Sequence, residues 1–347
     1  MTSRRFHSAV PAAVVVVVLC LVVGCDGTNS ARGPTPSSGQ ITPSSTPVKA
    51  DDGKVPIPAR GAYFGAYTFA GKEGRQASIT SLEQQIGRKF DIDHRFYRWD
   101  SAFPTPEDQS TAQQGRIAFW NWSSLLGNGT QVSWADIAAG KQDDVIDARA
   151  AAVRAFGHPI FLAFQHEPGG QVGRSTGDAG TAEDYRNAWR HIIERFRSRQ
   201  VTNVSWTWIL TAFAFAKGNP DGMYPGDDVI DWIAADGYNS FDCFGGRQHW
   251  RLFKEIYSDF YAWGRKHHKP LMSAEYGSVE DPAKPGRKGD WFRDLGQTLQ
   301  QWPEFKALVY FNSAPACQNW VTTSATALAG FRDLGLDPYI RAAARTQ

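Results

Sequence analysis

Short apolar segments alternate with amphipathic ones from about residue 59 to the end of the chain. The short segments are rich in β-branched and aromatic residues and have the length of buried strands. We predict eight strands, at residues 61–67, 93–99, 117–122, 160–165, 204–210, 233–238, 271–275 and 307–311. Between them, apolar residues recur at helical spacing at residues 78–87, 142–156, 182–199, 250–267, 289–301 and 325–334.

The alternation of strands and helices indicates an α/β fold. Strands that are apolar on both faces belong to parallel sheets covered by helices. Eight such strands in a chain of this length favour a (β/α)8 TIM barrel over an open doubly wound sheet, and no glycine-rich dinucleotide or phosphate loop follows the first strand. We therefore predict a single barrel domain at residues 59–347, with its chemistry at the carboxyl ends of the strands.

The first 58 residues have a different composition. Two arginines precede an apolar run at residues 9–23 that is short for a membrane span, which is the layout of a secretory signal. The Val-Val-Gly-Cys at residues 22–25 resembles the lipobox of bacterial lipoproteins, in which the cysteine is acylated. We predict a signal peptide at residues 1–24, lipidation of Cys25, and a flexible Pro/Ser/Thr-rich linker at residues 25–58. The alternative is an ordinary signal peptide with an incidental cysteine.

The charge of the chain excludes binding to nucleic acid by bulk electrostatics. The formal net charge of the 347 residues is +2, and the predicted signal carries two of the arginines and no acid. The mature chain would therefore be formally neutral. With the lipid as its only contact with the membrane, we expect an exported monomer whose barrel lies outside the cell.

Four cysteines occur in the sequence. Cys20 lies in the predicted signal, and Cys25 is the predicted lipid site. Cys243 and Cys317 remain, and disulfides persist in exported proteins. We therefore predict a bridge between Cys243 and Cys317, which would join two loops far apart in the sequence.

Two glutamates stand where apolar strands end. Glu167 follows the fourth predicted strand and precedes Pro168, and Glu275 ends the seventh. A lone glutamate in such a place is commonly a cap or a surface charge, but a barrel aims both of these toward one mouth. Paired carboxylates across a cleft suit the cleavage of a glycosidic bond, in which one group donates a proton while the other is ionised.

Further residues accompany the two glutamates. His166 stands directly before Glu167, the sequence Asp-Gly-Tyr-Asn occupies residues 236–239, and Lys-Pro-Leu-Met-Ser-Ala-Glu-Tyr-Gly occupies residues 269–277. In this order and spacing they resemble glycoside hydrolase family 26, the β-mannanase family of the retaining (β/α)8 glycosidase clan. The resemblance covers roughly residues 60–335.

The resemblance implies a role for each residue of the motif. Glu167 would be the general acid/base and Glu275 the nucleophile. Tyr238 would hydrogen-bond the nucleophile, and His166 would support the acid/base. Asp236 shares a strand face with Tyr238 and is expected to orient its neighbours. Regular alternation would turn His166 away from Glu167, so its role requires a bulge or twist at the strand end.

One loop departs from the family pattern. Where β-mannanases commonly continue His-Glu-Met-Asn-Gly toward a tryptophan, this chain has Pro168, Gly169 and Gly170 after Glu167. The loop on the leaving-group side is therefore expected to differ, so the resemblance bears on the type of reaction more than on mannan specificity.

The chain is rich in tryptophan, with 13 in all, and sugar rings are one kind of flat ligand that would use them. Four lie at or near predicted strand ends and are candidates for stacking on sugar: Trp99, Trp122, Trp208 and Trp320. Core packing is the alternative for each. Trp320 is the strongest candidate, because the family places a stacking residue at that position.

We therefore expect a lipid-anchored, extracellular endo-β-1,4-mannanase that acts on a β-mannan polysaccharide with no metal and no cofactor. The same mechanism on mixed-linkage β-glucan or β-1,3-xylan is one alternative. A sugar-binding lipoprotein on an inactive barrel is another. Histidines and aspartates do cluster at residues 91–94 and 267–268, but neither cluster has the spacing of a metal site.

Overall fold

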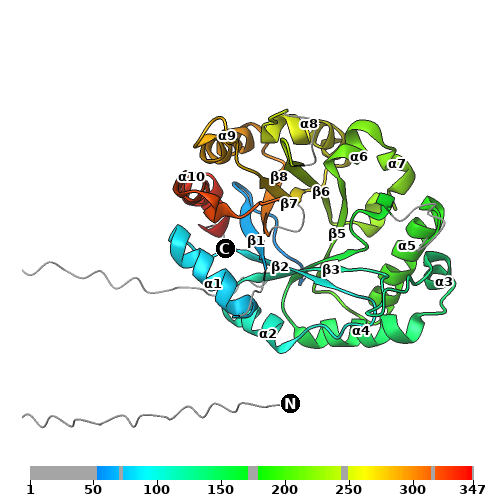
Figure 1. Ribbon diagram of the computed structural model, residues 1–347. Coiled ribbons are helices and arrows are strands. Elements are labelled where there is room, and N and C mark those ends of the chain that lie inside the picture. Colours follow the sequence, from blue (N-terminus) through cyan, green and yellow to red (C-terminus); the bar gives the residue numbers. More distant parts are fainter. Residues whose placement is uncertain (1–52, 70–72, 171–178, 244–248, 314–316, 346–347) are drawn as a thin grey trace, which may run out of the picture. The chain divides into compact units, whose positions relative to one another are not determined.

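Eight parallel strands close into a barrel in sequence order, surrounded by helices (Figure 1). This computed structural model describes residues 53–69, 73–170, 179–243, 249–313 and 317–345. The strands are β1 (Tyr63–Thr68), β2 (Ile92–Tyr97), β3 (Ile117–Trp122), β4 (Ile160–Phe164), β5 (Val204–Thr211), β6 (Trp232–Asn239), β7 (Leu271–Ser278) and β8 (Phe305–Asn312). All eight predicted strands are present, so the (β/α)8 barrel is confirmed.

The helices lie between the strands along the chain. They are α1 (Arg75–Ile86), α2 (Pro106–Gln113), α3 (Trp134–Ala138), α4 (Asp143–Phe156), α5 (Ala182–Ser198), α6 (Ala212–Lys217), α7 (Pro220–Met223), α8 (Phe253–Gly264), α9 (Arg287–Gln301) and α10 (Ala325–Leu336). The six predicted helices are confirmed. The other four, α2, α3, α6 and α7, are short and were not predicted. Short 3₁₀ turns occur at Pro168–Gly170, Asp227–Val229, Arg265–His267, Val321–Thr323 and Ile340–Arg345.

Two apolar layers follow from the alternation of side chains along the strands. The outer layer lies between the sheet and the helices and includes Trp120 and Phe156, whose rings are 5.2 Å apart. The inner layer fills the barrel with side chains such as Phe119, Phe161 and Trp232. The interior is thus a packed core rather than a pore, which leaves the carboxyl ends of the strands for chemistry.

The folded part begins before the predicted boundary at residue 59. The Val55 N–H donates to Ser205 Oγ at 3.0 Å, and Lys54 Nζ pairs with Asp231 Oδ1 at 2.6 Å. Val55 is also buried in the inner layer. The predicted signal peptide, Cys25 and the rest of the predicted linker lie outside the described residues. Within those residues, every helix is too short or too polar to cross a bilayer.

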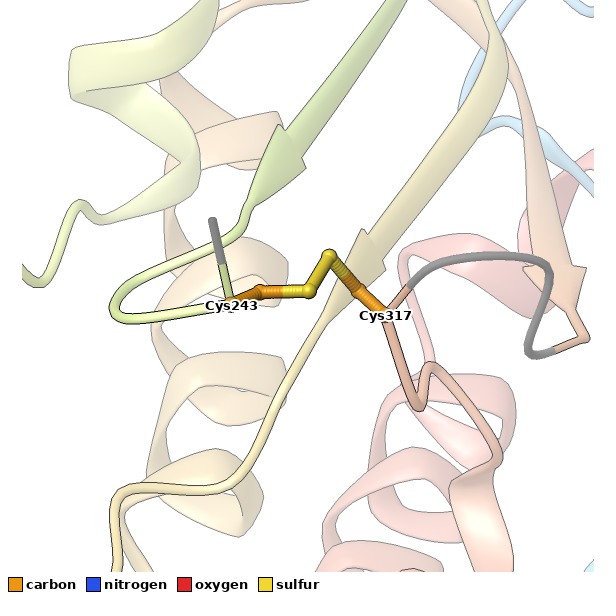
Figure 2. The surroundings of a disulfide bond; sticks show 2 residues. All are labelled: Cys243 and Cys317. Atoms are coloured by element: carbon orange, nitrogen blue, oxygen red, sulfur yellow. A yellow bond between two sulfur atoms is a disulfide. The ribbon is translucent and has the colours of Figure 1, made fainter. Parts of the chain in front are cut away.

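A disulfide joins Cys243 and Cys317, as predicted (Figure 2). Their Cα atoms are 5.7 Å apart, and the two residues are separated by 74 positions in the sequence. Cys243 follows β6 and Cys317 follows β8. The bridge therefore links the two loops on either side of the end of β7, the strand that carries Glu275.

Candidate active site

A bulge in β7 turns Glu275 into the mouth of the barrel. Ser273 pairs with Ala235 of β6, and Glu275 pairs with the next residue, Asp236, so Ala274 is an extra residue in β7. Ala274 belongs to the inner layer. Regular alternation would then turn Glu275 toward the helices, and the extra residue instead returns it to the inward face.

Tyr238 holds the Glu275 carboxylate. The Tyr238 hydroxyl donates a hydrogen bond to Glu275 Oε2, which confirms the contact predicted from the sequence. Tyr257 of α8 fixes the backbone at the same place, since its hydroxyl donates to the Glu275 carbonyl oxygen at 2.8 Å. Only 7% of Glu275 is exposed. This carboxylate therefore has little freedom to change its orientation.

The end of β4 departs from extended geometry, as the role of His166 requires. Gln165 and Glu167 both have left-handed backbone conformations, with φ of 47° and 50°. Gln165 Oε1 accepts hydrogen bonds from the N–H and hydroxyl of Ser124 at 2.8 and 2.9 Å, which anchors the turn. The His166 ring lies 5.2 Å from that of Phe96. The twist expected at this strand end is therefore present, while the support of Glu167 by His166 stays a prediction.

Glu167, Asp236 and Glu275 form a cluster of three carboxyl groups. Burial raises the pKa of each. It raises the pKa of Glu275 to about 8, with a further contribution from the charge of Glu167 and an opposing one from the Tyr238 hydrogen bond. The pKa of Asp236 lies well above its ordinary value, because both glutamates add to the effect of burial. Ionisation of one buried carboxyl group opposes ionisation of its neighbours, so the cluster retains protons at neutral pH.

Asp236 is the group that most readily keeps its proton. It is almost fully buried, and neither of its carboxyl oxygens meets an N–H or O–H donor with hydrogen-bond geometry among the described residues. Asp236 and Glu167 influence each other's pKa, so the two carboxyl groups are neighbours. A proton on Asp236 would allow it to donate a hydrogen bond to Glu167, which an ionised carboxylate cannot do. Burial also lowers the pKa of His166 to about 4, so this histidine is neutral at pH 7.

Three of the four candidate tryptophans lie in the core instead of the mouth. Trp99 and Trp122 are fully buried and stack on each other, with ring centroids 4.3 Å apart and planes 4° apart. Trp208 is fully buried against Trp263. Both faces of these rings are covered by protein, so the prediction that they contact substrate is wrong. Trp320 is half-buried in the loop after β8, and its stacking role stays a prediction.

Sequence reasoning missed several residues near the mouth. His94 and Asn121 are buried, and neither side chain makes a hydrogen bond that meets strict geometry within the described part of the chain. The period-two pattern of β2 and β3 could have placed them inside, because His94 pairs with the inward-facing Phe119. Two exposed aromatic residues, Phe69 and Phe213, gave no sequence signal. In the described ranges, no three His, Cys, Asp or Glu side chains form a group that could hold a metal ion.

The middle of the chain is similar to a known protein family. A family model described as Glycosyl hydrolase family 26 matches residues 99–257. Endoglucanase H of Acetivibrio thermocellus is 28% identical over 274 residues, which cover 76% of this chain and 29% of that protein. Beta-1,3-xylanase TXYA of a Vibrio species is 27% identical over 142 residues, which cover 40% of this chain and 28% of that protein. The chain thus spans less than a third of the length of these two curated relatives.

A solved structure shares the fold. The crystal structure of a beta-mannanase from a symbiotic protist of the termite Reticulitermes speratus, complexed with gluco-manno-oligosaccharide, superposes with a TM-score of 0.55 at 16% identity. The match covers 84% of this chain and 96% of that chain. At this level of identity the likeness establishes the barrel fold and does not indicate the substrate.

Proposed function

We propose that the protein is a family 26 glycoside hydrolase, which hydrolyses β-glycosidic bonds in a polysaccharide with retention of configuration. The observation that carries the proposal is the cluster of Glu167, Asp236 and Glu275. In this cluster the Tyr238 hydroxyl donates a hydrogen bond to Glu275 and not to Glu167. Two carboxyl groups in unlike environments at one mouth are what acid catalysis and nucleophilic attack need.

The reaction proceeds in two displacements. In the first, Glu275 attacks the anomeric carbon and forms an ester, while protonated Glu167 donates its proton to the departing glycosidic oxygen. In the second, ionised Glu167 takes a proton from water, whose oxygen attacks the same carbon and releases Glu275. The proton is thus returned to Glu167, and the configuration at the anomeric carbon is inverted twice.

We assign opposite protonation states to the two glutamates. The charge of Glu167 raises the pKa of Glu275, so protonation of Glu167 removes that contribution. The hydroxyl of Tyr238 favours a negative charge on Glu275. We therefore place the single charge shared by the glutamates on Glu275, which leaves Glu167 as the acid, as the motif resemblance implies.

We assign Asp236 a positioning role toward Glu167. The Asp236 proton that bonds Glu167 lowers the pKa of the acid/base and fixes the direction of its carboxyl group. Asp236→Ala should move the basic limb of the pH-rate profile upward, while Asp236→Asn, which keeps an N–H donor, should leave that limb in place. Equal profiles for the two variants would contradict this role.

The motif resemblance favours β-1,4-mannan as the substrate, with endo cleavage. Mixed-linkage β-glucan and β-1,3-xylan form the second candidate, favoured by the names of the curated relatives, an endoglucanase and a β-1,3-xylanase. Release of reducing sugar from the three polymers, with Glu275→Ala as the control, separates these substrates. Proton NMR of the first product anomer tests retention.

Two outcomes would count against the hydrolase. Binding of a polymer with no release of sugar under any condition would support the sugar-binding alternative. A first product of inverted configuration would exclude a covalent intermediate on Glu275.

We also propose that the protein is exported and held to the membrane by a lipid on Cys25. Labelled fatty acid should be incorporated by the full chain and not by the Cys25→Ser variant. Equal labelling of the two would overturn the anchor.

A further inference from the structure

A cavity of about 270 Å³ opens beside Glu167, where β5 runs into the short helices α6 and α7. Apolar side chains of Leu210 and Met223 line it, together with the aromatic ring of Phe213. Small-molecule sites typically have volumes of about 300–1,000 Å³, and this cavity is slightly smaller. That size suits one sugar unit better than several.

The lining of the cavity separates the two glutamates. Its described lining includes Glu167 and does not include Glu275. A general acid must lie within hydrogen-bond reach of the oxygen that departs, so the departing sugar occupies the Glu167 side of the scissile bond. A cavity whose described lining includes the acid and not the nucleophile is therefore in the right place for the departing sugar.

Phe213 offers an exposed flat surface at this cavity. The residue is 70% exposed, the largest exposure among the large hydrophobic side chains of the described residues. An exposed aromatic ring in the wall of a cavity is a platform for the apolar face of a sugar. On the neighbouring loop, Gly169 presents no side chain, and a Cβ atom added there would meet nothing within 4 Å. The β5 side of the mouth therefore supplies the stacking surface.

Two polar residues of the wall have hydrogen-bond donors that no other described residue uses. Thr211 Oγ1 accepts a hydrogen bond from the Ala214 N–H at 3.2 Å, so the hydroxyl proton of Thr211 can point to a ligand. Asn219 Oδ1 accepts a hydrogen bond from the Gly222 N–H at 3.0 Å. The amide nitrogen of Asn219 is therefore the atom that can donate to a ligand. Sugar hydroxyls are suitable acceptors for both.

We propose that this cavity is the subsite for the first sugar on the leaving-group side, with Phe213 as its stacking platform. The inference rests on the proposed hydrolase function and adds to it the place where the departing sugar binds. It also explains why Pro168, Gly169 and Gly170 follow Glu167. With the stacking ring supplied by α6, this loop does not need the tryptophan toward which β-mannanases continue.

The test compares two substrates that share the same glycone. One is an oligosaccharide with a sugar as leaving group, and the other is the matching glycosyl fluoride, whose leaving group fills no subsite. Phe213→Ala should lower kcat/KM for the oligosaccharide about ten-fold, equivalent to about 1.4 kcal/mol, and leave kcat/KM for the fluoride within about two-fold of wild type. The fluoride also shows that the variant is folded.

Phe69→Ala is the matched control. Phe69 is an exposed phenylalanine after β1, with its ring 6.5 Å from that of Trp320. This variant should leave the ratio of the two kcat/KM values unchanged. An unchanged ratio in Phe213→Ala as well would overturn the subsite. If wild type cleaves neither substrate, the hydrolase function itself fails and the subsite falls with it.

Discussion

The ends of β4 and β7 present their glutamates by different means. On β7, Glu275 follows a bulge inside the sheet and keeps ladder partners on β6, with Tyr238 bound to its carboxylate. On β4, the pairing with β3 ends at Phe164, and Glu167 lies beyond it in a left-handed turn. Glu275 is buried, whereas Glu167 is partly exposed beside a cavity.

This difference matches the demands of the two roles. A nucleophile must point at the anomeric carbon. A residue fixed within a paired strand already has that orientation, so little conformational entropy is lost during the reaction. An acid/base must meet a departing sugar and then a water, which requires access from outside. The disulfide adds to the asymmetry, because Cys243 and Cys317 tie together the loops on either side of β7.

Replacing each glutamate in turn should give the largest difference in activity between the ends of β4 and β7. Glu275→Ala should lower kcat by about 10⁴- to 10⁶-fold on every substrate, since it removes the covalent nucleophile. Glu167→Ala should cost about 10²- to 10⁴-fold on oligosaccharides, yet form the glycosyl-enzyme from a glycosyl fluoride. Rapid-quench kinetics and mass spectrometry detect that intermediate. Its accumulation in Glu275→Ala instead would reverse the assignments.

Removal of the disulfide tests the rigidity of the β7 side. The double variant Cys243→Ser, Cys317→Ser frees a loop closed across 74 positions, which should lower the free energy of unfolding by about 4 kcal/mol. Denaturant unfolding at 25 °C measures the loss, and the reduced wild type is the control. A loss below about 1 kcal/mol would show that the β7 side does not depend on the bridge.

Tyr238→Phe addresses the contact that distinguishes Glu275 from Glu167. Loss of a hydrogen bond to a charged group costs about 1.5–3 kcal/mol, so kcat/KM should fall by about 10- to 150-fold. The pKa of Glu275 should rise, which moves the acidic limb of the pH-rate profile to higher pH. Tyr257→Phe is the control, because Tyr257 bonds the backbone of Glu275 and not its carboxylate. An equal shift in both variants would contradict the special role of Tyr238.

The sequence predicted the elements of the barrel well because their signals are local. Strands buried on both faces read as continuous apolar runs, and the run at residues 117–122 coincides with β3. β7 continues to Ser278, past the predicted end at Glu275, because a charged residue interrupts the apolar pattern while the ladder goes on. Helix α6 escaped prediction because six residues are too few to establish a helical period.

The positions of the glutamates were predictable, but their directions were not. The inward turn of Glu275 depends on Ala274, whose place as an extra residue shows only in the register with β6. The turn at Gln165 and Glu167 uses left-handed conformations at residues other than glycine, which local sequence does not signal. Spacing likewise put Trp122 near a strand end, and only the fold shows that its side of the strand faces the helices.

The pH dependence of stability offers the finest test of the two ends. Burial raises the pKa of Glu275 to about 8 and also raises that of Glu167. Between about pH 4.5 and 8 the folded chain therefore holds protons that the unfolded chain has lost, so the free energy of unfolding falls as pH rises, by at most about 1.4 kcal/mol per pH unit for each carboxyl group. Glu275→Gln removes one titrating group, together with the charge that helps to raise the pKa of Asp236, so its stability should depend less on pH. Glu183→Gln, at an exposed position in α5, should follow wild type. Denaturant unfolding across this window measures all three, and parallel curves for wild type and Glu275→Gln would mean that the cluster takes up no extra proton on folding.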